Sequence, residues 1–159
     1  MSQKLYPEEM VATEIHVFSE TLLDGEWTAD KAETYVQELP NRFGWIDART
    51  EPVPCPRQYW LFGLLVDEVR YSWPWSFPEK GIPEDASPQV KQLSKSWSID
   101  GYAHSYLTIQ ELYEKSLELL IDPRPETQDL QEYLNQLLSG IPQTRDNLDE
   151  QRIVFWFDS

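Results

Sequence analysis

Prolines and aromatic residues crowd one segment, residues 70–83, and this segment most constrains the fold. It holds three prolines and four aromatic residues in fourteen positions. Proline fixes its own φ, donates no backbone hydrogen bond and disfavours a helical conformation in the residue before it. Neither a helix nor a central strand can therefore cross these residues. The sequence predicts a long loop here, at about residues 70–87.

The segments on either side of this loop carry helical signals. The apolar run at residues 57–69 is too long for an ordinary strand and predicts a buried helix, in which Gly63 would allow a close neighbour. Ser87 and Pro88 are typical of an N-cap and a first helical position, and Thr108 with Glu111 fits a capping box. Four more helices are thus predicted, over residues 28–39, 88–96, 108–121 and about 126–139.

Both ends of the chain have the composition of strands. Residues 13–20 are rich in β-forming side chains, and residues 152–158 (RIVFWFD) give a clear strand signal. Asp24-Gly25 predicts a turn into a short second strand or a helix start. Because an isolated strand is unstable, the two terminal strands are expected to pair. The predicted fold class is α+β, a small, mostly antiparallel sheet covered by four or five helices, in one domain over residues 1–159.

Net charge limits the class of partner. The chain has 28 acidic and 13 basic residues, which gives −15. Duplex nucleic acid is excluded as a direct ligand, because phosphate binding needs a basic surface. One cysteine cannot form an internal disulfide, the N-terminus lacks an apolar signal core, and no apolar run approaches the ~20 residues that span a bilayer. These features predict a soluble protein of a reducing cytoplasm, with no membrane partner.

The charge is unevenly distributed. Residues 1–41 carry −7 and residues 96–159 carry −8, whereas residues 42–95 contain seven acidic and seven basic residues and four of the seven tryptophans. Aromatic faces stack on bases, and arginine binds phosphate with two parallel hydrogen bonds. The middle third is therefore the candidate site for a small anionic, nucleotide-like ligand. The predicted ligand contacts are Arg57, Arg70, Tyr71, Trp73, Trp75, Lys80 and His104. The alternative is that these aromatic residues cap the core beneath a long loop.

Catalytic and cofactor motifs are missing from the sequence. His16 and His104 are the two histidines; they have no metal-ligand spacing, and Cys55 is far from both. No nucleophile elbow and no glycine-rich phosphate loop is present. His104 is expected in a loop at residues 100–106, with a structural hydrogen bond and no catalytic role. Neither a metal nor a cofactor is predicted, and Glu111, Glu114 and Glu118 are interpreted as a solvated helix face.

Four blocks of sequence occur together in a recognisable order: 59–70 (YWLFGLLVDEVR), 81–90 (GIPEDASPQV), 97–112 (WSIDGYAHSYLTIQEL) and 152–158 (RIVFWFD). In these blocks the chain resembles a family of small uncharacterised proteins found in bacteriophages and bacteria. It departs from the family pattern at Tyr102, where a second histidine is expected, and at Ser159, where asparagine is expected. The resemblance implies an association with phages and no particular reaction.

Three functions are compatible with these features. The first is a non-enzymatic protein of phage counter-defence, which sequesters a nucleotide-derived immune signal in the host bacterial cytoplasm. The second is an acidic inhibitor that binds a host defence protein, by nucleic-acid mimicry or in the manner of an anti-CRISPR protein. The third is a nucleotide hydrolase that uses His104. Association of the chain with itself is compatible with all three.

Overall fold

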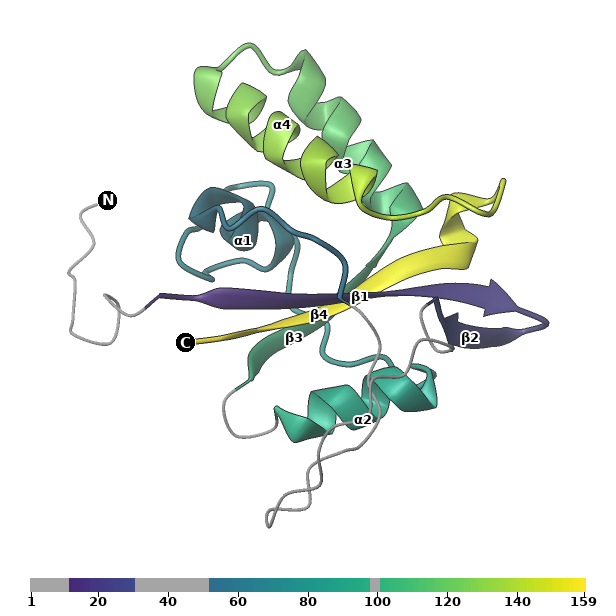
Figure 1. The fold of residues 1–159 in the computed structure, drawn as a ribbon. Helices are drawn as coiled ribbons and strands as arrows, with labels where there is room; N and C mark the ends of the chain where they lie inside the picture. The colour runs from purple at the N-terminus through teal and green to yellow at the C-terminus, as the bar shows by residue number, and fades with distance from the viewer. Residues whose placement is uncertain (1–11, 31–51, 98–100) are drawn as a thin grey trace.

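The computed structural model describes residues 12–30, 52–97 and 101–159. Four strands form one antiparallel sheet in the order β2-β1-β4-β3 (Figure 1). The strands are β1 (Glu14–Leu23), β2 (Glu26–Ala29), β3 (Tyr102–Thr108) and β4 (Gln151–Asp158). β1 and β4 pair along nearly their full length, with Glu14 opposite Asp158 and Thr21 opposite Gln151. The predicted pairing of the two terminal strands is confirmed.

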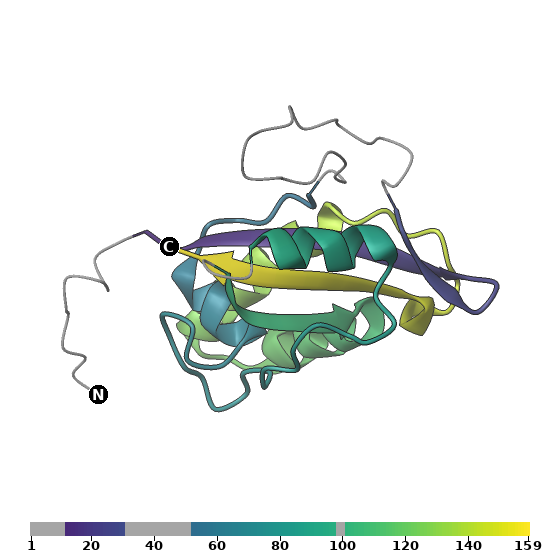
Figure 2. The same ribbon diagram turned by 90° about the horizontal axis from the view of Figure 1, so that it is seen from below.

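Helices cover both faces of this sheet. They are α1 (Tyr59–Leu65), α2 (Pro88–Ser96), α3 (Ile109–Ile121) and α4 (Pro125–Ser139), and a short 3-10 helix, Leu148–Glu150, precedes β4. α1, α3 and α4 lie on one face and α2 lies on the other (Figures 1 and 2). The predicted α+β class is confirmed. Within the described ranges, no helix is both long and apolar enough to cross a bilayer.

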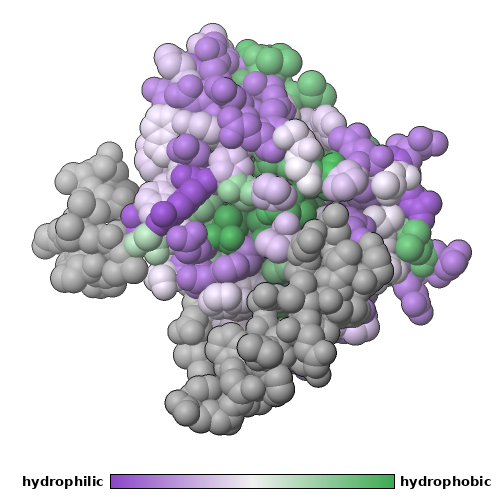
Figure 3. Space-filling view, viewed as in Figure 1, coloured by the Kyte–Doolittle hydropathy of each residue, from purple (hydrophilic) through white to green (hydrophobic). Residues whose placement is uncertain are grey.

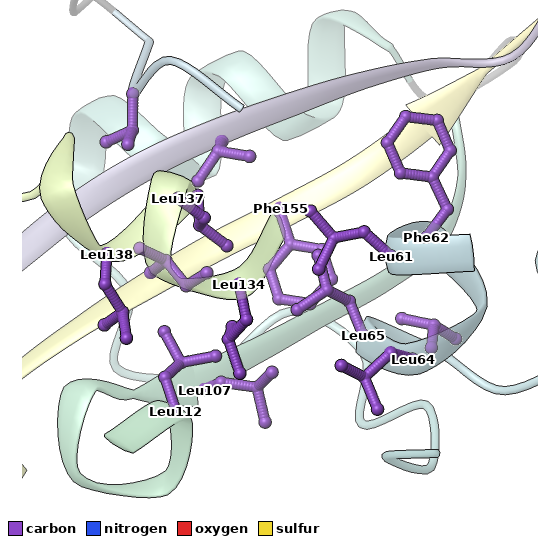
Figure 4. Close-up of a cluster of buried hydrophobic side chains, with 14 of the residues drawn as sticks. Leu61, Phe62, Leu64, Leu65, Leu107, Leu112, Leu134, Leu137, Leu138 and Phe155 are labelled. Atoms are coloured by element: carbon purple, nitrogen blue, oxygen red, sulfur yellow. The ribbon is translucent and has the colours of Figure 1, made fainter. Parts of the chain in front are cut away.

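The core has two parts, one on each face of β4. Leu61, Leu65, Leu134 and Phe155 belong to the larger cluster, between the sheet and α1, α3 and α4 (Figure 4). Trp156 lies in the smaller cluster beneath α2. Every residue of β4 is buried, as expected of a central strand that is covered on both faces.

α2 and α3 begin at the predicted capping residues. The Ser87 hydroxyl accepts a hydrogen bond from the Val90 amide at 3.3 Å, with Pro88 at the first helical position. Thr108 and Glu111 form the complete capping box that begins α3. These interactions satisfy amide groups that the first turn of a helix leaves without a partner.

The helix predicted at residues 57–69 is shorter than expected. α1 covers Tyr59–Leu65, and Val66 is already extended. Glu68 and Arg70 then take positive φ values of 74° and 65°. Left-handed conformations are costly for non-glycine residues and end a right-handed helix, so the chain turns sharply into the proline-rich loop. Residues 70–87 contain neither helix nor strand, as predicted.

Two further predictions were wrong. Residues 28–29, predicted to begin a helix, belong to β2. Asp24 and Gly25 both have positive φ and close a two-residue hairpin between β1 and β2. Residues 31–39 of the predicted helix lie outside the described residues. The predicted loop at residues 100–106 lies largely in β3. A bulge with Ala103 at φ 53° shifts the register there and interrupts the alternation that marks a strand.

Candidate functional site

The candidate site is a hollow between the start of α1 and α4. Its volume is about 350 Å³. Its lining consists of Arg57, Gln58, Tyr59 and Trp60 from the start of α1, and Asp129 and Tyr133 from α4. The lining therefore combines an arginine, a glutamine, an aspartate and three aromatic residues.

Arg57 lies at the entrance to α1 and is half exposed. Its Nε donates a hydrogen bond to the Thr13 carbonyl at 3.3 Å, and its Nη2 lies 3.6 Å from a carboxylate oxygen of Glu14. The second distance is an ion-pair contact and exceeds that of a good hydrogen bond. Because a guanidinium carries five N–H donors, Arg57 retains the capacity to bind an anion in the hollow.

Arg57 and Arg70 converge on Tyr59. The guanidinium carbon of Arg70 lies 4.1 Å from the centre of the Tyr59 ring, a cation–π contact. The Thr13 amide donates a hydrogen bond to the Tyr59 hydroxyl at 3.2 Å. This hydrogen bond lowers the pKa of Tyr59, and the charges of Arg70 and Arg57 lower it further. Burial acts in the opposite direction and raises the pKa, but the net shift is downward. Arg57 and Arg70, two of the predicted ligand contacts, thus both act on one tyrosine in the wall of the hollow.

The aromatic residues of the 70–87 loop stack on one another beside α1. Tyr71 and Trp73 lie 4.5 Å apart between ring centres, Trp73 and Trp75 lie 5.7 Å apart, and Trp60 meets Trp73 edge-on at 5.4 Å. The indole nitrogen of Trp73 donates to the Trp60 carbonyl at 3.1 Å. Arg124 covers Trp75 at 4.4 Å. Trp73 and Trp75 are therefore engaged largely with the protein itself, while Tyr71 is 41% exposed.

Lys80 and His104 lie away from the hollow. The loop passes along β3, where the Lys80 amide donates to Ser105 Oγ and the Gly81 amide donates to the His104 carbonyl. The Lys80 ammonium group binds Glu111 at 3.1 Å and lies 4.7 Å from the Tyr106 ring centre. The sequence prediction thus combined residues that the fold places in two separate regions.

His104 packs on the face of the sheet that α2 covers. Its ring stacks on Trp156, with 5.6 Å between ring centres. Burial, partly opposed by the charge of Glu79, lowers the pKa of His104. At neutral pH this histidine is a neutral aromatic contact.

The other histidine forms a cluster that the sequence analysis missed. His16 Nε2 donates a hydrogen bond to Asp158, and the His16 ring stacks on Trp97 at 4.3 Å. Trp156 belongs to the same cluster as Trp97, beneath α2. Its ring centre lies 6.4 Å from that of His16. The antiparallel pairing of the two ends of the chain, which was predicted, is the signal that could have placed His16 near Asp158.

The described residues provide neither a metal-binding cluster nor a reactive thiol. Among the residues with described positions, no three histidine, cysteine, aspartate or glutamate side chains are grouped so as to hold a metal ion. Burial raises the pKa of the Cys55 thiol to about 12. Cys55 is thus a protonated, weakly nucleophilic thiol at neutral pH.

Comparison of the chain with protein families, with curated proteins and with solved structures finds no match. The resemblance to small phage and bacterial proteins therefore stays a prediction.

Proposed function

We propose that this protein binds a small, planar, anionic ligand of the nucleotide class in the hollow between α1 and α4, without transforming it. The observation that carries the proposal is the convergence of Arg57 and Arg70 on Tyr59, in the wall of this hollow. In a chain with a net charge of −15, an anion is repelled unless the local negative charge is offset, and Arg57 and Arg70 here offset the carboxylates of Glu14 and Asp129.

The size and lining of the hollow fit such a ligand. A volume of about 350 Å³ lies at the lower end of the range for small-molecule sites. Tyr133 and Trp60 offer ring faces, and a base stacked on an aromatic side chain gains ~1–3 kcal/mol. Gln58 and Asp129 provide amide and carboxylate groups that can bind the polar edge of a base.

The biological setting follows from the resemblance to phage proteins. A small protein that binds a nucleotide-derived signal and leaves it intact acts as a sponge, which fits counter-defence in an infected bacterium. Inhibition of a host defence protein by the acidic surface remains the second proposal. Sequestration differs from it in requiring Arg57, because mimicry of nucleic acid would depend on the acidic side chains.

Calorimetric titration with a panel of cyclic, linear and mononucleotides tests the proposal. Arg57→Ala should weaken binding of the tightest nucleotide about tenfold or more, since it removes a charge-assisted contact to phosphate. Lys91→Ala is the matched control, because it removes one exposed positive charge from α2 on the other face of the sheet. An equal loss in both variants, or no binding of any nucleotide to the native protein, would overturn the proposal.

A hydrolase is a further candidate, and the contact between His16 and Asp158 favours it. A carboxylate that orients an imidazole is the usual arrangement of a general base. Mass spectrometry of the nucleotide after incubation separates the two functions. Sequestration returns the nucleotide intact, whereas hydrolysis returns a product whose formation stops in His16→Asn.

A further inference from the structure

The outward face of α3 carries an apolar stripe that the hollow does not use. Leu117, Leu120 and Ile121 are 60%, 59% and 83% exposed. With Tyr113 they follow the spacing of four and three residues by which one helix packs against another. Apolar atoms gather over the tip of the α3–α4 pair, at the top of Figure 3. Single exposed leucines are common, but three adjacent large aliphatic side chains at this exposure indicate a contact surface.

The surroundings of this stripe are acidic. Residues 109–126 contain five acidic and two basic residues, which gives −3. Glu114 lies one turn before Leu117, and among the described residues it has no cationic partner: its carboxylate accepts a hydrogen bond from the Gln110 amide at 2.9 Å. An occupant of the stripe therefore meets negative charge at its edge.

Both nearby cations are engaged by neighbouring side chains. Lys115 has a side chain that is 12% exposed, and its ammonium group lies 4.9 Å from the Phe77 ring centre. Arg124 lies over Trp75 and binds Asp122 at 2.7 Å. Lys115 also binds Glu118 at 3.0 Å, so the two cations are paired with Glu118 and Asp122, and no described contact pairs either of them with Glu114.

We infer that this stripe is a docking surface for an amphipathic helix of a partner protein, with aliphatic residues on one side and lysine or arginine along its edge. The aliphatic residues would cover Leu117, Leu120 and Ile121, and a basic side chain would neutralise Glu114. Charge complementarity of this kind determines which partner a helix accepts. A second copy of this chain is a poorer occupant, because it would bring another acidic edge and another net charge of −15.

A synthetic helical peptide of about three heptads, with leucine at a and d and lysine at e and g, provides the probe. Fluorescence anisotropy with the full-length protein should show binding that Leu117→Ser combined with Leu120→Ser weakens about tenfold or more. Leu23→Ser, on an exposed leucine at the far end of β1, is the matched control and should leave the affinity unchanged. A peptide with glutamate at e and g should bind more weakly than the lysine peptide.

Any of the following results would overturn the inference. One is equal affinity of the native protein and the double variant for the lysine peptide, and another is an equal loss in Leu23→Ser. A further such result is a native dimer in sedimentation equilibrium that becomes monomeric in the double variant, because a second copy would then be the occupant.

If the double variant unfolds at a lower temperature than the native protein, Glu114→Lys replaces it in the binding experiment. That change should weaken binding of the lysine peptide and strengthen binding of the glutamate peptide, and the opposite result would also overturn the inference.

Discussion

Glu20 and Arg152 form an ion pair that is buried in the centre of the sheet, between β1 and β4. The Arg152 Nε donates to a Glu20 carboxylate oxygen at 2.8 Å, and the side chains are 4% and 0% exposed. The other Glu20 oxygen accepts the Ser87 amide at 2.7 Å, at the start of α2. Arg152 also binds Asp85 at 3.0 Å and stacks on Trp27 at 3.9 Å. One pair therefore joins both terminal strands, the β2 strand and the beginning of α2.

Arg152→Met should lower the free energy of unfolding by about 3–5 kcal/mol, because it leaves the Glu20 carboxylate buried without its cationic partner. Urea denaturation followed by circular dichroism measures this loss. Glu118→Gln is the control, since it breaks the partly exposed pair with Lys115 and should cost less than about 1 kcal/mol. Similar losses in the two variants would show that the buried pair has no special role in stability.

Gly63 determines how closely the 70–87 loop approaches α1. A Cβ at this position would lie 2.6 Å from the carbonyl carbon of Tyr71, which is closer than van der Waals contact allows. Gly63→Ala should therefore destabilise the fold by about 1–3 kcal/mol, although alanine favours a helix intrinsically. Ser94→Ala, at a partly exposed position of α2, controls for helix propensity. A melting temperature of Gly63→Ala equal to or above the native value would contradict the observed packing.

His104 should make the fold less stable in weak acid. Burial lowers its folded pKa below the ordinary value of about 6.5. Between the lowered value and about 6.5, the unfolded chain binds a proton that the folded chain does not, so the free energy of unfolding falls as the pH falls through this window. The contribution is fully present above about 6.5.

His104→Phe, which keeps a ring against Trp156, should lose this part of the pH dependence. Urea denaturation of both proteins at several pH values between about 7.5 and 5 measures the difference between them. The two proteins differ only at residue 104, so the difference between their pH profiles reports on His104. Parallel curves for the native protein and the variant would show that His104 titrates alike in the folded and unfolded chains.

The sequence was most informative where local chemistry acts alone. Ser87-Pro88 and the Thr108–Glu111 capping box placed α2 and α3, because capping depends on residues within one turn. β3 escaped notice because its bulge at Ala103 breaks the alternation, and because its main stabiliser is the distant strand β4. Pairing between distant segments leaves no local trace in such a strand.

Some residues of the candidate site could likewise be predicted from the sequence, and others could not. Arg57 and Arg70 were both predicted as ligand contacts; Arg57 lies two residues before Tyr59 in sequence, and the turn after α1 brings Arg70 back over the Tyr59 ring. Asp129 and Tyr133 were missed, because the sequence does not show which side of α4 faces α1. Lys80 and His104 were grouped with the arginines on composition, whereas the loop carries Lys80 past the hollow to the β3 edge.

The tryptophans of the 70–87 loop provide a comparison between two similar side chains. Trp73 and Trp75 stack on each other, but only Trp73 has a described partner for its indole nitrogen, the Trp60 carbonyl. The indole nitrogen of Trp75 is buried without a hydrogen-bond partner in the described structure. Replacement by phenylalanine removes the same atoms at both positions and keeps an aromatic ring there, so the main difference between the variants is the loss of the Trp73 hydrogen bond.

Trp73→Phe should therefore lower the free energy of unfolding by about 1 kcal/mol more than Trp75→Phe does. The first change leaves the Trp60 carbonyl without its hydrogen-bond donor, whereas the second removes a donor that already has no described partner. Chemical denaturation of the two variants side by side measures this difference. Trp60 also lines the hollow, so Trp73→Phe should shift nucleotide affinity more than Trp75→Phe does. Equal stability of the variants would mean that the Trp73 hydrogen bond is not formed in solution, and a larger loss of affinity in Trp75→Phe would make Trp75 a direct ligand contact.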